Sequence, residues 1–264
     1  MLGLALGGGG ARGSAHLGVL KHFEEIKVRP DCIAGTSAGA IIASLYAFEI
    51  PTKIIHEEIK KLKPATATGL RFGELGLVEN VSLRKMLESL LGKDCKIEDA
   101  KIPLAIHVTN CETGIGENLT QGSVIDAVMA SSCVPGLYVP PLIDNKIYVD
   151  GGLTENVPFS ALKALGANKT IGINLNGMMS YERPEGALDV ISNALDIAID
   201  SQTKKQLEKF DDVLNIDLRG FSRTSASQAE ALIEKGYAAA KSHFPNRSHI
   251  RWLKLKKIWH TLTH

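Results

Sequence analysis

Four consecutive glycines, Gly7–Gly10, come directly after the apolar run Leu2–Leu6. Glycine weakens both helices and strands, so this junction predicts a buried strand that ends sharply in a loop. A helical pattern then runs from about Ser14 to Ile26 and stops before Pro30. The sequence therefore predicts a unit made of a strand, a glycine loop and a helix.

The rest of the chain alternates short apolar runs with amphipathic helical patterns. Strands are predicted at residues 32–35, 103–109, 146–149, 170–175 and 212–216. Helices are predicted at residues 38–48, 52–62, 82–91, 123–130, 186–209 and 227–240. The last of these helices begins with the capping-box spacing Ser227-Gln-Ala-Glu230. The alternation predicts an α/β fold, a three-layer sandwich whose mainly parallel central sheet is covered on both faces.

The charge balance excludes one class of partner. The 264 residues include 30 Lys and Arg against 29 Asp and Glu, a net charge of +1. A general nucleic-acid binder is strongly basic, so no nucleic-acid partner is expected. The distribution is uneven, however, because the part from Lys235 onward holds seven basic and no acidic residues. The preceding 234 residues carry 23 basic and 29 acidic groups and a net charge of −6.

The cysteines and the hydropathy pattern bear on the compartment. Cys32, Cys95, Cys111 and Cys133 lie far apart and show no metal-ligand spacing, which predicts reduced thiols and neither metal nor other cofactor. No run approaches the roughly 20 apolar residues of a membrane span, and the apolar start lacks the basic region of a signal peptide. We expect a cytoplasmic protein that at most contacts the inner membrane surface.

The motif Gly35-Thr36-Ser37-Ala38-Gly39 lies between a predicted strand and a predicted helix. In that context G-x-S-x-G is typical of a sharp turn that holds the serine in a strained, exposed position. Glycine two residues away on each side leaves room for such a backbone. Ser37 is therefore a candidate nucleophile. The alternative, that Ser37 only caps its helix, does not account for both glycines.

The glycine loop, Gly7 to Gly13, is a candidate anion site. Consecutive glycines let N–H groups converge on an anion, assisted by the dipole of the following helix. The spacing Gly8-x-Gly10-x-x-Gly13 also matches a dinucleotide fingerprint, which requires an acidic residue after the second strand. The nearest acid, Asp31, precedes that strand, and the Gly-Lys-Ser or Gly-Lys-Thr sequence of a Walker loop is missing. A loop aimed at an oxyanion fits better.

A third motif, Asp150-Gly151-Gly152, follows the strand at 146–149. Taken alone, it predicts only a tight turn. A serine nucleophile needs a base, however, and a carboxylate at the end of a strand in a parallel sheet lies on the edge where Ser37 emerges. Asp150 is therefore the candidate base.

Taken together and in this order, the three motifs resemble the patatin-like phospholipases, especially their small bacterial members. Two further segments are similar to the family's second conserved block: Ala130-Ser-Ser-Cys-Val-Pro-Gly-Leu137 and Tyr148-Val-Asp-Gly-Gly-Leu-Thr-Glu-Asn-Val-Pro158. The resemblance covers residues 1–175, and no family motif follows Leu175.

This resemblance implies a patatin-like fold and a serine hydrolase that cleaves lipid or other acyl esters through an acyl-enzyme. It implies that Ser37 is the nucleophile and Asp150 the base of a Ser–Asp dyad without histidine. The oxyanion hole is implied to consist of the backbone N–H groups of Gly8, Gly9 and Gly10. The positions implied to shape the surrounding loops are Arg12, Gly13, Gly35, Gly39, Gly151 and Gly152.

A Ser–His–Asp triad is the main mechanistic alternative. In α/β-hydrolase order its histidine would follow Asp150. The histidines that do so are His243, His249, His260 and His264. His16 lies close to the glycine loop, where we expect a structural role.

Other functions remain open at this level. An acyltransferase would use the same serine and pass the acyl group to an acceptor other than water. A regulatory or adaptor protein would keep the fold without catalysis, although the intact serine, aspartate and glycine loop argue against it. A dinucleotide-binding protein is the least favoured alternative.

We also predict the roles of two segments outside the motifs. Residues 1–244 are predicted to form the catalytic domain and residues 245–264 a basic amphipathic tail. Within that tail, Arg251–Leu262 holds both tryptophans of the chain and can form a helix that lies in a membrane interface or packs on protein. The glycine-containing segment Lys63–Asn80 is predicted to be a loop that acts as a lid.

Overall fold

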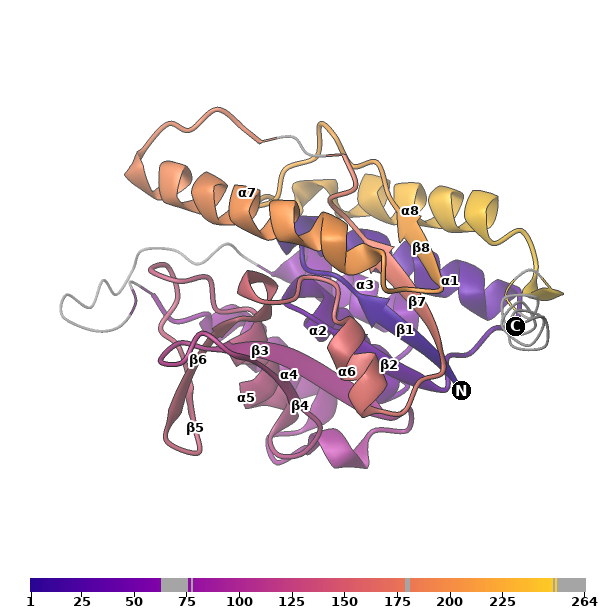
Figure 1. The fold of residues 1–264 in the computed structure, drawn as a ribbon, viewed down its shortest axis with the longest axis horizontal. Coiled ribbons are helices and arrows are strands. Elements are labelled where there is room, and N and C mark those ends of the chain that lie inside the picture. Colours follow the sequence, from indigo (N-terminus) through magenta and orange to yellow (C-terminus); the bar gives the residue numbers. More distant parts are fainter. Residues whose placement is uncertain (63–75, 77, 179–180, 249, 251–264) are drawn as a thin grey trace, which may run out of the picture.

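In the computed structural model, the chain forms a mixed eight-stranded sheet between two layers of helices (Figure 1). The structure describes residues 1–62, 76, 78–178, 181–248 and 250. The spatial order of the strands is β5-β6-β3-β2-β1-β7-β8, and β4 pairs with β3. The strands are β1 (Leu2–Leu6), β2 (Cys32–Gly35), β3 (Leu104–Asn110), β4 (Gly116–Leu119), β5 (Leu142–Ile143), β6 (Lys146–Asp150), β7 (Lys169–Asn174) and β8 (Asp212–Asn215). The predicted three-layer α/β fold is confirmed.

The helices alternate with these strands along the chain. They are α1 (Ala15–Glu25), α2 (Ala38–Ala47), α3 (Thr52–Lys61), α4 (Val81–Leu91), α5 (Val124–Ser131), α6 (Phe159–Ala164), α7 (Ala187–Leu207) and α8 (Ala229–His243). Short 3₁₀ segments are η1 (Gly10–Ser14), η2 (Ile97–Asp99), η3 (Gly151–Leu153) and η4 (Ala226–Gln228).

Every strand and helix that was predicted within the described residues is present, but three elements were missed. These are β4, β5 and α6, which are too short or too polar to show a clear hydrophobic period. The predicted capping box is wrong, because α8 begins at Ala229 and its N-cap residue is Gln228, without a side-chain capping hydrogen bond. Ser227 belongs instead to the preceding 3₁₀ segment.

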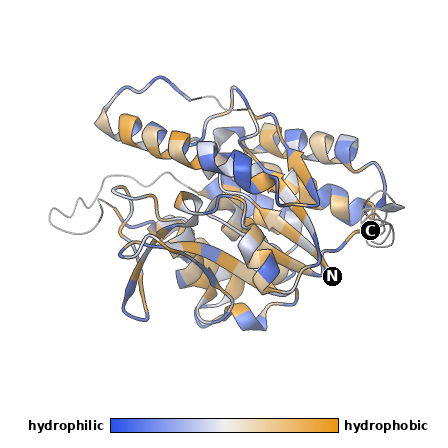
Figure 2. Ribbon diagram, viewed as in Figure 1, coloured by the Kyte–Doolittle hydropathy of each residue, from blue (hydrophilic) through white to orange (hydrophobic). Residues whose placement is uncertain are grey.

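Alternating side chains of the central strands form two cores. Leu4 and Leu6 of β1 belong to the larger core, which also contains buried residues of α1, α2, α3, α4, α5 and α8. Ala5 faces the smaller core, which contains α6. Small residues are needed there because α6 and the segment after it pack closely: a methyl group on Gly3 would lie 3.0 Å from the Leu162 Cδ2 of α6 and 2.8 Å from the Ala167 Cβ. Figure 2 shows apolar residues along the central strands and also on the helices that cover them.

The sheet is parallel in the middle and antiparallel at one edge. Strands β3, β2, β1, β7 and β8 run parallel to their neighbours in this row, whereas β4 and β6 are both antiparallel to β3 and β5 is antiparallel to β6. The last residue of β2, Gly35, pairs with Ile106, and β3 then continues to Asn110. This overhang of β3 pairs with β6, and Asp150 lies opposite Val108. The carboxylate therefore lies just beyond the end of β2.

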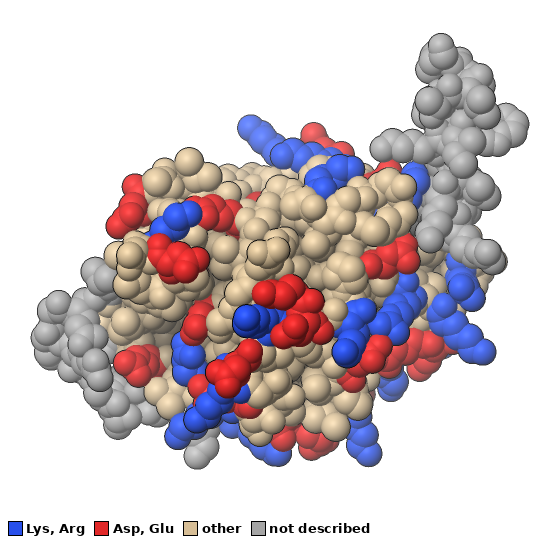
Figure 3. Space-filling model, turned by 90° about the horizontal axis from the view of Figure 1, so that it is seen from below, with Lys and Arg blue, Asp and Glu red and all other residues tan. Residues whose placement is uncertain are grey.

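The surface gives two further observations. None of the helices in the described part of the chain is both long enough and apolar enough to cross a bilayer. On the face shown in Figure 3, basic side chains are interspersed with acidic ones rather than gathered into one field.

Candidate active site

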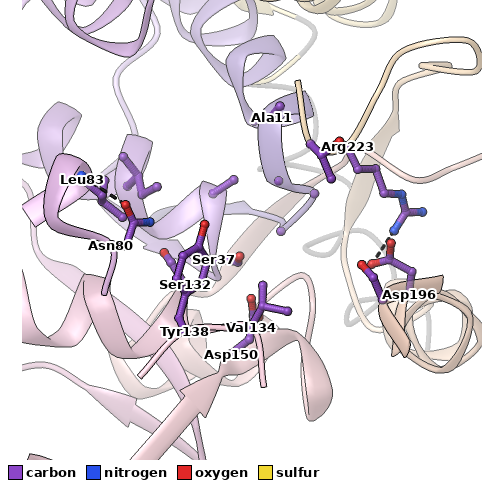
Figure 4. Close-up of a pocket in the computed structure, with 18 of the residues that line it drawn as sticks. Ala11, Ser37, Asn80, Leu83, Ser132, Val134, Tyr138, Asp150, Asp196 and Arg223 are labelled. Carbon is purple, nitrogen blue, oxygen red and sulfur yellow. Dashed lines mark hydrogen bonds and ion pairs between the residues drawn. The ribbon is translucent and has the colours of Figure 1, made fainter. Parts of the chain in front are cut away.

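A cavity of about 410 Å³ opens where β1 and β2 end and the glycine loop and α2 begin. Ser37, Asp150 and the glycine loop all line it, so the structure brings together the three predicted motifs. In Figure 4, Ser37 and Asp150 lie in the middle of the cavity, with Leu83 on one side and Arg223 on the other.

Ser37 occupies a strained turn between β2 and α2. Its backbone has φ 52° and ψ −123°, a left-handed conformation that non-glycine residues rarely adopt. A methyl group on Gly35 would lie 2.4 Å from the Gly39 carbonyl oxygen, and one on Gly39 would lie 2.0 Å from the Leu6 carbonyl oxygen. The predicted need for both glycines is therefore confirmed. Ser37 is also the N-cap residue of α2, but its side chain makes no capping hydrogen bond.

A buried serine that the sequence analysis did not single out holds this turn. The Ser37 N–H donates to the Ser131 Oγ at 2.8 Å, and that hydroxyl donates to the His107 carbonyl at 2.7 Å. Ser131 is fully buried at the end of α5. It therefore connects the strained turn to β3. Ser131 lies inside the segment Ala130–Leu137, which resembles the family's second conserved block, and this resemblance was the sequence signal from which it could have been found.

Asp150 is buried at the end of β6, with 8% of its surface exposed. Burial raises the pKa of Asp150 from 3.8 to about 6, and the nearby Asp196 carboxylate adds to the rise. Hydrogen bonds from the Gly152 N–H, at 2.8 Å, and from the Ser37 hydroxyl act in the opposite direction. Asp150 lies at the predicted edge of the sheet, just beyond the end of β2. The prediction that it follows a parallel strand is wrong: β6 is antiparallel to β3 and reaches this edge by pairing with the part of β3 that extends beyond β2.

The three glycines implied to form the oxyanion hole differ in their hydrogen bonds. The Gly8 N–H already donates to the Asn156 carbonyl at 3.2 Å. Among the described residues, the N–H groups of Gly9, Gly10 and Ala38 have no such partner, and all three residues line the cavity. Ala38 directly follows Ser37, which is the second place from which oxyanion donors come in serine hydrolases with this turn. The available donors are therefore those of Gly9, Gly10 and Ala38.

Close packing at the predicted supporting positions fixes the loops around the site. The buried Arg12 guanidinium donates to the Phe221 carbonyl from Nε at 2.9 Å and from Nη2 at 2.7 Å. A methyl group on Gly13 would lie 2.6 Å from the Ala38 Cβ. One on Gly151 would lie 2.3 Å from the His107 carbonyl oxygen.

The walls of the cavity have two different characters. One side is apolar and comes mainly from α2, α3, α4 and the segment after α5: Ile41, Ile42, Ile59, Leu62, Leu83, Val134 and Leu137. The other side is mainly polar and comes from α7 and the segment before α8: Ser192, Asp196, Arg223 and Thr224, with Ile199 as an apolar member. An elongated ligand with one apolar and one polar end fits this division.

Asn156 is another cavity residue that sequence reasoning missed. Its Nδ2 is buried and has no hydrogen-bond partner in the described part of the chain. A methyl group on Gly8 would contact both the Asn156 Oδ1, at 2.7 Å, and the Ser37 Cβ, at 3.1 Å. The carboxamide therefore lies next to the serine.

No described histidine lines the cavity. His16 is buried and its Nε2 lies 2.8 Å from the Gly7 carbonyl oxygen, the structural role that was expected. His243 pairs with Asp212 of β8 at 2.9 Å. The other candidates for a triad, His249, His260 and His264, lie outside the described residues. Within those residues, no group of three or more His, Cys, Asp or Glu side chains is arranged to hold a metal ion.

Two predicted segments fall wholly or largely outside the described residues. These are the amphipathic helix at Arg251–Leu262 and most of the lid at Lys63–Asn80. Asn80, at the end of the lid segment, is described and lines the cavity.

Comparisons with known proteins place these features in context. A family model described as Patatin-like phospholipase matches residues 4–163. Lysophospholipase NTE1 of Mycosarcoma maydis is 32% identical over 197 residues, which cover 72% of this chain and 10% of that protein. Neuropathy target esterase sws of Drosophila melanogaster is 32% identical over 183 residues, which cover 66% of this chain and 13% of that protein. The match thus spans only a small part of these relatives.

The fold has a neighbour among solved structures. The crystal structure of VipD from Legionella pneumophila aligns with a TM-score of 0.53 and 16% sequence identity. The alignment covers 91% of this chain and 66% of that one.

Proposed function

The chain belongs to the patatin-like phospholipase family, and from that premise we propose that it is a serine lipid-acyl hydrolase of the phospholipase or lysophospholipase type. The observation that carries the proposal is that Ser37, in its strained turn, and the buried Asp150 carboxylate line the same cavity, which has one apolar and one polar side. The apolar side suits an acyl chain and the polar side suits the alcohol part of an ester.

The proposed reaction begins with attack on the ester carbonyl. The Ser37 Oγ forms a bond to the carbonyl carbon, and the hydroxyl proton passes to the Asp150 carboxylate. The negative charge moves to the carbonyl oxygen, where the N–H groups of Gly9, Gly10 and Ala38 stabilise it. When the carbon–oxygen bond to the alcohol breaks, Asp150 returns the proton to the leaving alcohol.

The acyl group is then esterified to Ser37. A water molecule loses a proton to Asp150 and attacks this ester, and the fatty acid leaves as the serine recovers its proton. Asp150 suits both steps because its pKa of about 6 makes it a stronger base than an ordinary aspartate while it stays mostly ionised at pH 7.

A lipid-panel assay tests the proposal directly. We expect wild-type protein to release fatty acid from at least one phospholipid or lysophospholipid, and a fluorophosphonate probe to label Ser37. The Ser37→Ala variant should lose both signals, and Asp150→Asn should lose at least 100-fold in kcat (about three orders of magnitude being typical for a lost base). Ser227→Ala removes an exposed serine and serves as the control.

The same assay separates the alternatives. Labelling of Ser37 without release of free fatty acid, together with acyl transfer to an added alcohol or lysolipid, would identify an acyltransferase. A folded protein that neither reacts with the probe nor turns over any ester would be a regulatory or adaptor protein.

We also propose that the chain reaches its substrate at an anionic membrane surface through the basic segment Arg251–Leu262. The support is compositional: both tryptophans and four basic residues occur in these twelve positions. Ile250 is buried in the larger core, so truncation directly after Ile250 removes the segment and leaves the core intact. The truncated protein should lose binding to anionic liposomes in a flotation assay, and undiminished binding would rule the segment out.

A further inference from the structure

Arg223 contacts the glycine loop through its main chain, although it lies far outside the residues 4–163 that match the family model. The Ala11 N–H donates to the Arg223 carbonyl at 2.8 Å. A methyl group on Gly10 would lie 2.2 Å from that same oxygen, and Gly10 has φ +58°. The backbone at Arg223 therefore fits directly against the part of the loop that carries the available N–H donors.

The side chain of Arg223 extends in another direction and binds α7. Its Nη1 pairs with Asp196 at 2.8 Å and its Nη2 with Asp200 at 2.6 Å. The Asp200 side chain is 1% exposed and the Arg223 side chain 13% exposed, so the second ion pair is buried. The Tyr181 hydroxyl also donates to Asp200, at 3.1 Å, and the guanidinium lies 5.5 Å from the centre of the Tyr181 ring. Figure 4 shows Arg223 and Asp196 together on one side of the cavity.

A second connection strengthens the link between the two segments. Arg12, within the glycine loop, donates two hydrogen bonds to the carbonyl of Phe221, two residues before Arg223. The stretch 221–223 is therefore bonded to the glycine loop on one side and to α7 on the other.

We propose that Arg223 is a positioning residue that holds the Gly9 and Gly10 N–H groups in place by tying the glycine loop to α7. A run of glycines has no side chains of its own to fix its backbone, so its geometry must come from neighbouring contacts. Oxyanion donors lose their effect when they move by about 0.5 Å or more from the productive geometry. The inference rests on the proposed function, because it concerns the donors of that reaction.

The test variant is Arg223→Met combined with Asp200→Asn. The second substitution prevents an unpaired buried carboxylate, which would destabilise the protein for an unrelated reason. We expect kcat to fall about 10- to 100-fold, less than the roughly 10²–10³ lost with a whole donor. Arg223 also lines the polar side of the cavity, so its loss is expected to raise KM as well, and the fall in kcat is the change that tests the positioning role. The rate of reaction with a fluorophosphonate should fall by the same factor as kcat, since its phosphoryl oxygen occupies the same site.

Two further variants complete the experiment. Arg219→Met is the matched control, because Arg219 lies four residues away and pairs with Asp217 at the surface, so kcat should stay at the wild-type value. Arg223→Lys keeps the positive charge but lacks the rigid fork of the guanidinium that reaches both carboxylates, so its kcat should lie between those of the wild type and the double variant.

The outcomes distinguish this inference from the proposed function. If wild-type protein neither hydrolyses any lipid ester nor is labelled at Ser37, the proposed function fails and the inference with it. If the wild type and Arg219→Met are active, a folded double variant with wild-type kcat overturns the role of Arg223, and so does a raised KM with unchanged kcat. If circular dichroism shows that the double variant is unfolded, Arg223→Lys decides, and wild-type kcat in that variant overturns the inference.

Discussion

Replacing Asp150 by asparagine should stabilise the protein at neutral pH while it removes the proposed base. Burial raises the pKa of this carboxyl from 3.8 to about 6, even though it accepts hydrogen bonds from the Gly152 N–H and the Ser37 hydroxyl. A difference of about two pH units between the folded and unfolded pKa values corresponds to about 3 kcal/mol of free energy of unfolding. Ionised Asp150 therefore destabilises the folded state by about that amount.

The direction of the pKa shift of Asp150 determines how the stability of the protein depends on pH. Because the folded pKa is the higher one, the group favours folding below pH 3.8, and this contribution is lost as the pH rises through about 6. Asparagine cannot ionise, and its Oδ1 can still accept the hydrogen bond from Gly152. The stability difference between Asp150→Asn and wild type should therefore be only about 0.5 kcal/mol at pH 4 and grow to about 3 kcal/mol in favour of the variant at pH 7 to 8.

Urea unfolding of both proteins at five pH values from 4 to 8 measures this difference. Asp217→Asn is the control: it removes an exposed carboxylate that pairs with Arg219, whose hydrogen bonds lower the pKa of Asp217 to about 2. That control should gain no stability at pH 7. A difference between Asp150→Asn and wild type that is absent at pH 7, or equal at pH 4 and pH 8, would refute the reasoning.

Three other substitutions give further predictions. Asp196→Asn removes a negative charge that raises the pKa of Asp150, so the acidic limb of the kcat/KM profile should move to lower pH; a limb that stays in place would contradict this. Ser131→Ala removes the acceptor for the N–H of Ser37, the proposed nucleophile, and should lower kcat about 10-fold in ester hydrolysis, with Ser131→Thr restoring part of it. Gly39→Ala should abolish soluble expression or cost more than about 4 kcal/mol in urea unfolding, whereas Gly186→Ala, at an open position at the N-cap of α7, should cost less than about 1 kcal/mol.

The sequence was sufficient for the parts of the site that depend on local backbone chemistry. The turn at Ser37 needs glycine at positions 35 and 39, and the loop after β1 needs glycine where other segments approach within van der Waals distance. These requirements leave visible marks in the sequence because only one residue type meets them. Apolar periodicity likewise located every strand that is long and buried enough to show it.

Features that depend on how distant segments meet could not be predicted in this way. The direction of β6 is one example, since a short apolar strand has the same pattern whether it runs parallel or antiparallel to its neighbour. Arg223 is another, because its partners on the glycine loop and α7 are far away in sequence and no local motif surrounds it. The N–H of Gly8 was implied to be a donor, yet its carbonyl partner at Asn156 is visible only in the structure.

The stability cost of Asp150 and its proposed chemistry have one physical origin. Burial disfavours the carboxylate relative to the carboxylic acid, which costs folding free energy and strengthens the base by the same amount, about 100-fold in proton affinity for two pH units. A histidine would supply a base of that strength without such burial, since its ordinary pKa is about 6.5. A dyad without histidine therefore needs a buried aspartate, and a substitution that relieves the burial of Asp150 should raise stability and lower activity together.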